Sequence, residues 1–151
     1  MHDKTDLTEF VTFTIAGQLF GLPIARVQDV FKPPHITRVP LAGAEVAGVL
    51  NLRGRIVTVI DMRHRLDVRH RQDGDTPMAI GIEAKGEPFG LLVDAVGEVL
   101  KLPVTEREQN PINLDRKLAT LSAGVYRLDG ELLVVLDIDR VLDLRAEAAA
   151  A

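Results

Sequence analysis

The chain has 151 residues, 46% of them apolar and 26% charged, with a formal net charge of −4; this is typical of one globular domain. It contains no cysteine, which excludes disulfides, cysteine-ligated zinc and a thiol nucleophile and fits a reducing compartment. A mildly acidic chain with 4% aromatic residues gives little support for nucleic-acid binding, and no apolar run approaches the ~18 residues of a membrane-spanning helix.

Short apolar segments in the first half predict β-strands. Residues 11–15 alternate between large apolar residues and threonines, which is strand periodicity. Ala16-Gly17-Gln18 is a predicted turn that leads into a second strand at 19–24. Further on, an apolar stretch from 50 to 60 is divided by Gly54, which predicts two strands joined by a turn.

A polar segment, 63–77, precedes the second half. It carries four arginines and is predicted to be a solvated linker: Arg63, Arg65, Arg69 and Arg71. The apolar pattern then restarts, and the predicted strands of the second half are 78–82, 89–93, 96–102 and 132–136. A turn at Gly86-Glu87 is expected between the first two.

The two halves of the sequence are an internal repeat. "GQLFGLPIARVQDV" (17–30) matches "GEPFGLLVDAVGEV" (86–99), and "AGVLNLRGRIVTVIDMRHRLD" (47–67) matches "AGVYRLDGELLVVLDIDRVLD" (123–143). Short strands with Gly and Pro turns, written twice, predict an all-β protein of two small barrels. Halves of about 65 residues are marginal alone, so we expect them to pack together as one cooperative unit with a groove between them.

Four of these segments carry a resemblance to a known family. In chain order they are "FGLPIARVQDV" (20–30), "GVLNLRGRIVTVIDMR" (48–63), "FGLLVDAVGEVL" (89–100) and "LVVLDIDRVL" (133–142). The sequence resembles the CheW family, the coupling proteins of bacterial chemotaxis. Two departures are visible, because the family often has Pro where Thr58 stands and Glu where Asp29 stands.

The resemblance implies a fold and a role. The expected fold is two tandem five-stranded SH3/OB-like barrels with short helical turns, at 10–72 and 73–145, between tails at 1–9 and 146–151. The expected role is a scaffold without catalysis, cofactor or metal. It would bind the regulatory domain of the histidine kinase CheA and the cytoplasmic tip of chemoreceptors, as a cytoplasmic protein recruited to receptor arrays at the membrane.

The turn "NLRG" (51–54) differs between the two repeats. Shared positions are predicted to serve the fold: Gly48/Gly124, Leu52/Leu128, Gly54/Gly130 and Asp61/Asp137. Arg53, by contrast, is replaced by Asp129. It is either a solvated hairpin tip or an anchor at the rim of the groove, since Arg offers a rigid donor fork and is enriched in interface hot spots. The resemblance favours the anchor, and the predicted partner-binding residues of this segment are Gly48, Asn51, Leu52, Arg53 and Gly54.

Two further sets complete the predicted partner-binding residues. Val27, Asp29 and Phe31 form either one face of an ordinary strand or an exposed apolar and acidic stripe that docks a receptor helix. The second repeat has Val96, Glu98 and Val99 in this region, and these side chains are expected on the opposite wall of the groove.

Several aspartates could suggest an enzyme: Asp61, Asp94, Asp137 and Asp139. No Ser-His pair or metal-ligand spacing accompanies them, and the recurrence of Asp61 at Asp137 favours a helix cap or a strand end. A ligand- or oligonucleotide-binding pair of barrels remains a distant alternative, and an enzyme a more distant one.

Overall fold

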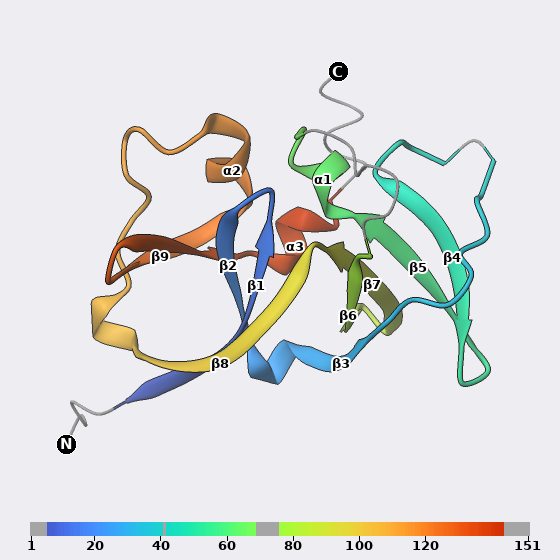
Figure 1. Ribbon diagram of the computed structural model, residues 1–151, viewed down its shortest axis with the longest axis horizontal. Coiled ribbons are helices and arrows are strands. Elements are labelled where there is room, and N and C mark those ends of the chain that lie inside the picture. Colours follow the sequence, from blue (N-terminus) through green and yellow to red (C-terminus); the bar gives the residue numbers. More distant parts are fainter. Residues whose placement is uncertain (1–5, 41, 69–75, 144–151) are drawn as a thin grey trace.

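The fold consists of two five-stranded sheets, each curled into a barrel, with short helices between them (Figure 1). The computed structural model describes residues 6–40, 42–68 and 76–143. The strands are β1 Leu7–Ile15, β2 Gln18–Pro23, β3 Val27–Phe31, β4 Val46–Leu52, β5 Arg55–Asp61, β6 Met78–Ala84, β7 Glu87–Val93, β8 Ala95–Pro103, β9 Ser122–Leu128 and β10 Glu131–Leu136. The helices are α1 Met62–Arg65, α2 Arg116–Leu121 and α3 Ile138–Val141, and Ile24–Arg26 and Val104–Glu106 are 3₁₀ turns.

The two barrels exchange strands between the repeats. Barrel A has the strand order β8-β1-β2-β10-β9, and barrel B has the order β3-β6-β7-β5-β4. The first hairpin of each repeat therefore joins the last three strands of the other repeat, through parallel pairs β2–β10 and β5–β7. The expected division into a barrel at 10–72 and a barrel at 73–145 is thus corrected, since apolar alternation determines which face is buried and not which strand is the neighbour.

The expected tails differ from the structure in one respect. Residues 7–9 belong to β1, where Leu7 pairs with Pro103 of β8, so the predicted tail at 1–9 is too long. The predicted tail at 146–151 lies outside the described residues.

Each barrel is closed in the same way by an isolated bridge. Thr37, beyond β3, pairs with Val49 of β4, and Glu108, beyond β8, pairs with Val125 of β9. Gly48 and Gly124, which precede these strand residues, have φ angles of 148° and 127°. A Cβ on Gly48 would overlap the carbonyl oxygen of Thr37. The glycine that recurs in both repeats therefore serves barrel closure.

Three hairpins share the backbone of a type I′ turn. The pairs Ala16–Gly17, Arg53–Gly54 and Lys85–Gly86 all have positive φ at both residues, which matches the right-handed twist of the flanking strands. These are the turns expected at residues 16–18, 51–54 and 86–87. In the β9–β10 hairpin, Gly130 has a positive φ but Asp129 does not.

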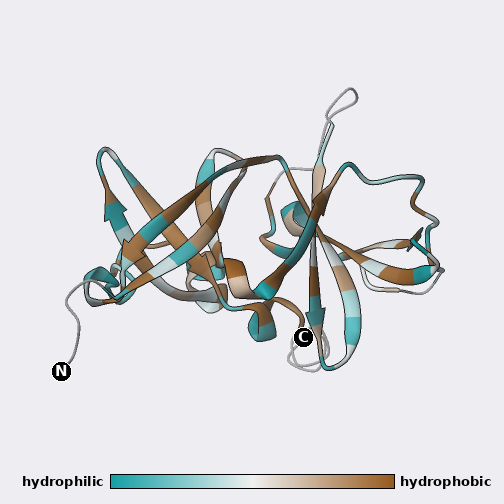
Figure 2. Ribbon diagram, turned by 90° about the horizontal axis from the view of Figure 1, so that it is seen from below, coloured by the Kyte–Doolittle hydropathy of each residue, from teal (hydrophilic) through white to brown (hydrophobic). Residues whose placement is uncertain are grey.

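One apolar core joins the barrels, which agrees with the expectation that the two halves pack together. Its largest cluster includes Phe13, Phe20, Leu22, Val125 and Val134 of barrel A, and Ile60, Ile80, Ile82, Leu91 and Val93 of barrel B. Figure 2 shows apolar residues along the strands of both barrels. No helix in the described part of the chain is long and apolar enough to cross a membrane.

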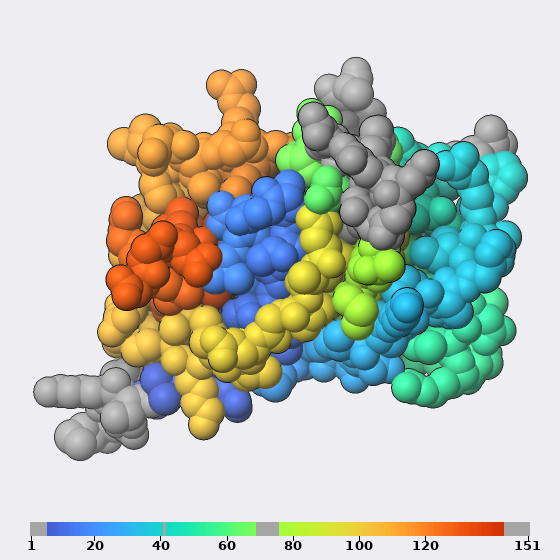
Figure 3. All heavy atoms as spheres, viewed as in Figure 1, coloured from blue at the N-terminus to red at the C-terminus, as the bar shows by residue number. Residues whose placement is uncertain are grey.

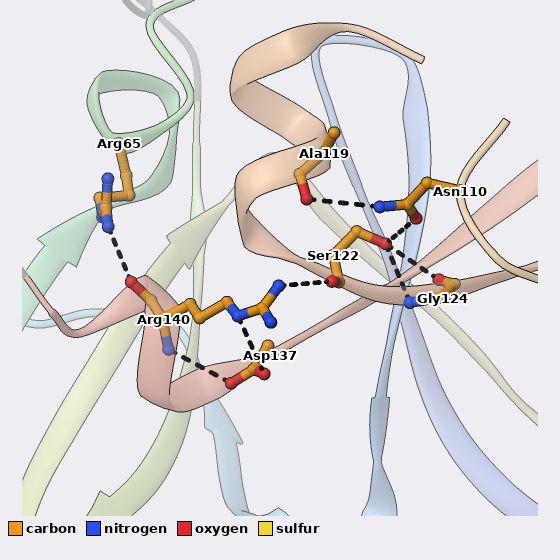
Figure 4. Close-up of polar contacts among 7 residues, drawn as sticks. All are labelled: Arg65, Asn110, Ala119, Ser122, Gly124, Asp137 and Arg140. Carbon is orange, nitrogen blue, oxygen red and sulfur yellow. Dashed lines mark hydrogen bonds and ion pairs between the residues drawn. The ribbon is translucent and has the colours of Figure 1, made fainter. Parts of the chain in front are cut away.

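Aspartates cap the helices that follow β5 and β10. The Asp61 side chain accepts a hydrogen bond from the backbone N–H of Arg63, and that of Asp137 accepts one from Arg140 (Figure 4). The predicted cap role of these two residues is therefore confirmed. Asp94 joins the barrels instead, because its carboxylate accepts from the Ala16 N–H at 2.7 Å and from Arg63 Nε and Nη2 at 2.9 and 2.6 Å.

Arg65 is buried, with 3% of its surface exposed. Its Nε lies 2.7 Å from the Val141 carbonyl oxygen. Its Nη2 lies 2.7 Å from the Arg140 carbonyl oxygen, at the end of α3 (Figure 4). Burial lowers the pKa of its guanidinium, although nearby carboxylates oppose this shift. The prediction of a solvated linker is therefore wrong for Arg65, and also for Arg63, whose side chain is 17% exposed and pairs with Asp94. Residues 69–75, with Arg69 and Arg71, lie outside the described residues.

Candidate partner-binding site

The β4–β5 turn holds Arg53 in a left-handed conformation. The Arg53 φ is 53° and the Gly54 φ is 83°, and the Asn51 side-chain oxygen accepts a hydrogen bond from the Gly54 N–H at 3.0 Å. A non-glycine residue in this region carries a cost of about 1–2 kcal/mol. Ala16 and Lys85 have the same conformation in the other two type I′ turns, so this φ belongs to the turn type, and the Asn51 side chain stabilises the β4–β5 turn.

Arg53 forms an ion pair with Asp29, another predicted site residue. Arg53 Nη1 lies 2.9 Å from Asp29 Oδ2, and the two side chains are 75% and 27% exposed. An exposed pair of this kind contributes about 1 kcal/mol or less to stability. The contact is an ion pair without hydrogen-bond geometry, since Asp29 Oδ2 has no hydrogen-bond partner among the described residues. It places the guanidinium next to β3, so that the turn and β3 meet at one end of barrel B.

A hollow of about 290 Å³ lies at this end of barrel B. We call it the barrel B hollow. Its lining residues come from β3, from the β4–β5 hairpin and from β6 and β7: Gln28, Asp29, Phe31, Leu52, Arg53, Arg55, Val57, Gly81, Ile82, Pro88 and Phe89. The structure therefore brings four predicted residues, Asp29, Phe31, Leu52 and Arg53, to one site.

Strand β3 does not present the predicted stripe to solvent. Val27, Asp29 and Phe31 are half-buried, whereas Gln28 and Val30 on the opposite face are exposed. Val27 packs against the shared core, and Phe31 against the core of barrel B. The ordinary-strand interpretation describes this face correctly, with Asp29 and Phe31 reaching the hollow.

The other predicted residues lie elsewhere. Val96, Glu98 and Val99 are on β8, an edge strand of barrel A, and none of the three lines the barrel B hollow. Glu98 and Val99 are exposed, and Val96 is half-buried against the shared core. Gly48 is placed at the closing bridge, where its backbone serves the fold.

Arg55 was missed by the sequence interpretation. It lines the hollow and its Nη2 lies 3.4 Å from Glu83 Oε1. A signal was available, because Arg55 corresponds to Glu131 in the second repeat, the same reversal of charge that separates Arg53 from Asp129. Within residues 6–40, 42–68 and 76–143, no group of three or more His, Asp or Glu side chains could hold a metal ion.

Comparison with known proteins identifies the family. Residues 9–146 match the CheW-like domain. The chain belongs to the CheW-like domain family. It is 30% identical over 135 residues to the chemotaxis protein CheW of Thermotoga maritima, covering 89% of this chain and 87% of that protein. It is 26% identical over 142 residues to CheW of Bacillus subtilis, covering 94% and 91%.

Two further matches extend this family relation. The crystal structure of the scaffolding protein TtCheW from Thermoanaerobacter tengcongensis superimposes with a TM-score of 0.81 at 28% identity, covering 91% of this chain and 94% of that one. The chain is also 27% identical over 134 residues to the chemotaxis protein CheA of Salmonella typhimurium, covering 88% of this chain but 19% of CheA. The all-β, two-barrel fold expected from the sequence is confirmed.

Proposed function

We propose that this protein is a non-enzymatic scaffold that couples chemoreceptors to the kinase CheA in bacterial chemotaxis, and that the barrel B hollow binds one of these partners. Membership of the CheW-like family and the match to a scaffolding protein support the coupling role. The match to a segment of CheA supports the kinase as a partner, because both proteins contain this domain.

The observation that carries the site is the Arg53–Asp29 ion pair at the mouth of the hollow. The second repeat has the same hairpin but carries Asp129 and Glu131 in place of Arg53 and Arg55. The fold therefore does not require a basic residue here. A largely exposed guanidinium beside apolar side chains such as Phe31 and Phe89 has the composition of an interface anchor.

The test is the substitution Arg53→Ala, with the CheA regulatory domain and a receptor cytoplasmic tip as titrants. We expect the affinity for at least one titrant to fall about 30-fold, which corresponds to ~2 kcal/mol for a hot-spot residue. The thermal midpoint should change little, because Ala at this φ is also a non-glycine residue and the lost ion pair is exposed.

Arg127→Ala is the matched control. Arg127 is 63% exposed and forms a similar ion pair with Glu108, at 3.0 Å, but on barrel A. It should leave both affinities unchanged. If Arg53→Ala and Arg127→Ala have equal affinities for both titrants, the proposed anchor is rejected. If the thermal midpoint of Arg53→Ala lies well below that of the wild type, Arg53 serves the fold.

Val96, Glu98 and Val99 remain a second proposed surface, for the partner that does not use the hollow. We place the protein in the cytoplasm, at receptor arrays on the inner face of the membrane. An equivalent role in twitching motility or another chemosensory pathway is the alternative. Identification of the kinase and receptor that co-purify with the protein from its native cytoplasm distinguishes the pathways.

A further inference from the structure

A second hollow lies among the three helices, and we call it the helical hollow. It measures about 580 Å³ and is lined by Arg65 of α1, by Arg116, Lys117, Thr120 and Leu121 of α2 with its cap Asp115, and by Arg140 and Asp143 at α3. None of these residues lines the barrel B hollow, so the two sites are separate. Its size falls within the range of ordinary ligand sites, about 300–1,000 Å³.

The helical hollow is basic although the chain is acidic. It is lined by four cationic and two anionic side chains, whereas the formal net charge of the chain is −4. A local excess of positive charge in a concave site attracts anionic partners and raises their local concentration. Charge complementarity therefore favours an acidic partner.

The three arginines among these cations differ in how far the fold already uses them. Arg65 donates to two carbonyl oxygens of α3, and Arg140 donates to the Ser122 carbonyl oxygen at 3.3 Å and lies 3.6 Å from Asp137 (Figure 4). These contacts fix both side chains at the wall. Arg116 is exposed and has no hydrogen bond or ion pair within the described part of the chain, so its donors are available to a partner.

An apolar notch of about 130 Å³ adjoins the helical hollow at Asp115, which lines both. The notch lies between the β1–β2 turn, the end of α1, and α2, and its apolar walls are Ile15, Phe20, Leu66, Val68 and Leu118. Figure 3 shows the surface of α2 next to that of the β1–β2 hairpin on this face. Since one water occupies about 30 Å³, the notch has room for a branched aliphatic side chain.

We propose that this face binds an acidic peptide segment of a protein partner, with carboxylates on the cations of α2 and α3 and one apolar side chain in the notch. A small inorganic anion would use the cations but leave the notch empty. The combination of a basic hollow and an adjoining apolar notch favours the peptide. This proposal is independent of the role of the barrel B hollow.

The test uses the full chain and short synthetic peptides, with binding followed by backbone amide NMR shifts. The probe is the acetylated, amidated peptide EELEE, and the comparison probes are EEGEE, QQLQQ and inorganic pyrophosphate. EELEE should shift the amides of α2, α3 and the β1–β2 turn, and its affinity should fall with added salt. EEGEE, which lacks the apolar side chain, and QQLQQ, which lacks the charge, should each bind at least fivefold more weakly.

Arg116→Glu separates loss of binding from loss of fold. Glu is favourable in the first turn of a helix, so the variant should fold like the wild type while its affinity for EELEE falls at least tenfold. Arg38→Glu, which changes the charge equally at an exposed position after β3, is the control and should bind normally. The proposal is overturned if EELEE shifts no amides of α2, α3 and the β1–β2 turn. It is also overturned if Arg116→Glu and Arg38→Glu lower the affinity for EELEE equally. Equal affinities for EELEE, EEGEE and pyrophosphate overturn it in favour of a small-anion site.

Discussion

Barrels A and B share their strand pairing, but the side chains at the corresponding ends of the two barrels differ. The strand registers correspond, since Thr12 pairs with Gly21 in barrel A as Gly81 pairs with Gly90 in barrel B. At four equivalent positions barrel A carries the larger side chain: Phe10 for Ala79, Tyr126 for Leu50, Leu133 for Val57, and Thr12 for Gly81. In barrel A, three of these side chains belong to a buried cluster. Their barrel B counterparts are also buried together, but barrel B has a hollow beside them, lined in part by Leu52 and Val57.

The packed end of barrel A is also covered. Phe10 and Tyr126 make an edge-to-face contact with ring centroids 5.5 Å apart, and the Arg107 guanidinium lies over both rings at 5.7 and 5.8 Å. Because the two barrels share their strand pairing, the difference between their ends comes from the side chains and not from topology.

The largest expected loss of stability comes from removing a large buried side chain from barrel A. Phe10→Ala gives barrel A the residue that barrel B has at this position, and it should lower the free energy of unfolding by about 3–5 kcal/mol. Urea unfolding followed by circular dichroism measures the loss. Ala79→Gly, which removes one buried methyl group from barrel B, is the comparison and should cost far less. Equal losses would mean that the two ends are packed alike.

Alanine in place of the two glycines at the closing bridges, Gly48 and Gly124, should lower stability by different amounts. Gly48→Ala places a Cβ in overlap with the Thr37 carbonyl group, whereas a Cβ on Gly124 would meet the Arg107 side chain at 2.9 and 3.0 Å and the Glu108 carbonyl oxygen at 3.1 Å. A side chain can move aside more easily than a backbone carbonyl. With the strained φ included, Gly48→Ala should cost about 3 kcal/mol and Gly124→Ala clearly less. Denaturant midpoints decide this, and the reverse order would contradict the closure argument.

The smallest expected effect concerns the Tyr126 hydroxyl. This oxygen is buried and has no hydrogen-bond partner among the described residues, while the side chain as a whole fills barrel A. A buried polar group without a partner carries a penalty of about 1–3 kcal/mol, so Tyr126→Phe should raise the free energy of unfolding by up to ~1 kcal/mol. A clear loss of stability in the thermal midpoint would show that the hydroxyl has a partner in solution.

Local features of the fold could be predicted because their physical cause is local. The turn at Gly17, the turn at Gly54 and the cap at Asp61 follow from φ freedom and from hydrogen bonding within a few residues. The exchange of strands between repeats could not be predicted in this way. Both repeats present the same apolar pattern, so β2 fits β10 and β5 equally well by pattern alone.

The candidate site was predictable only where the repeats differ in charge. Arg53 stands out against Asp129, and the same comparison would have found Arg55. The orientation of Asp29 could not be read from alternation, because a strand with two partly polar faces does not reveal which one is inside. The burial of Arg65 was also hidden, since its partners are backbone carbonyls of α3 that lie far away in the sequence.

Strand exchange also has a consequence for the order of events on the ribosome. All the strands of barrel B have been made once β7 has emerged, because β3 to β7 supply them. The β1–β2 hairpin is made first but has to wait for β10, the strand next to β2. At about 5–20 residues per second, this wait is on the order of 10 s. During synthesis the nascent chain therefore holds an apolar hairpin without its barrel, and this hairpin is where a chaperone would be needed.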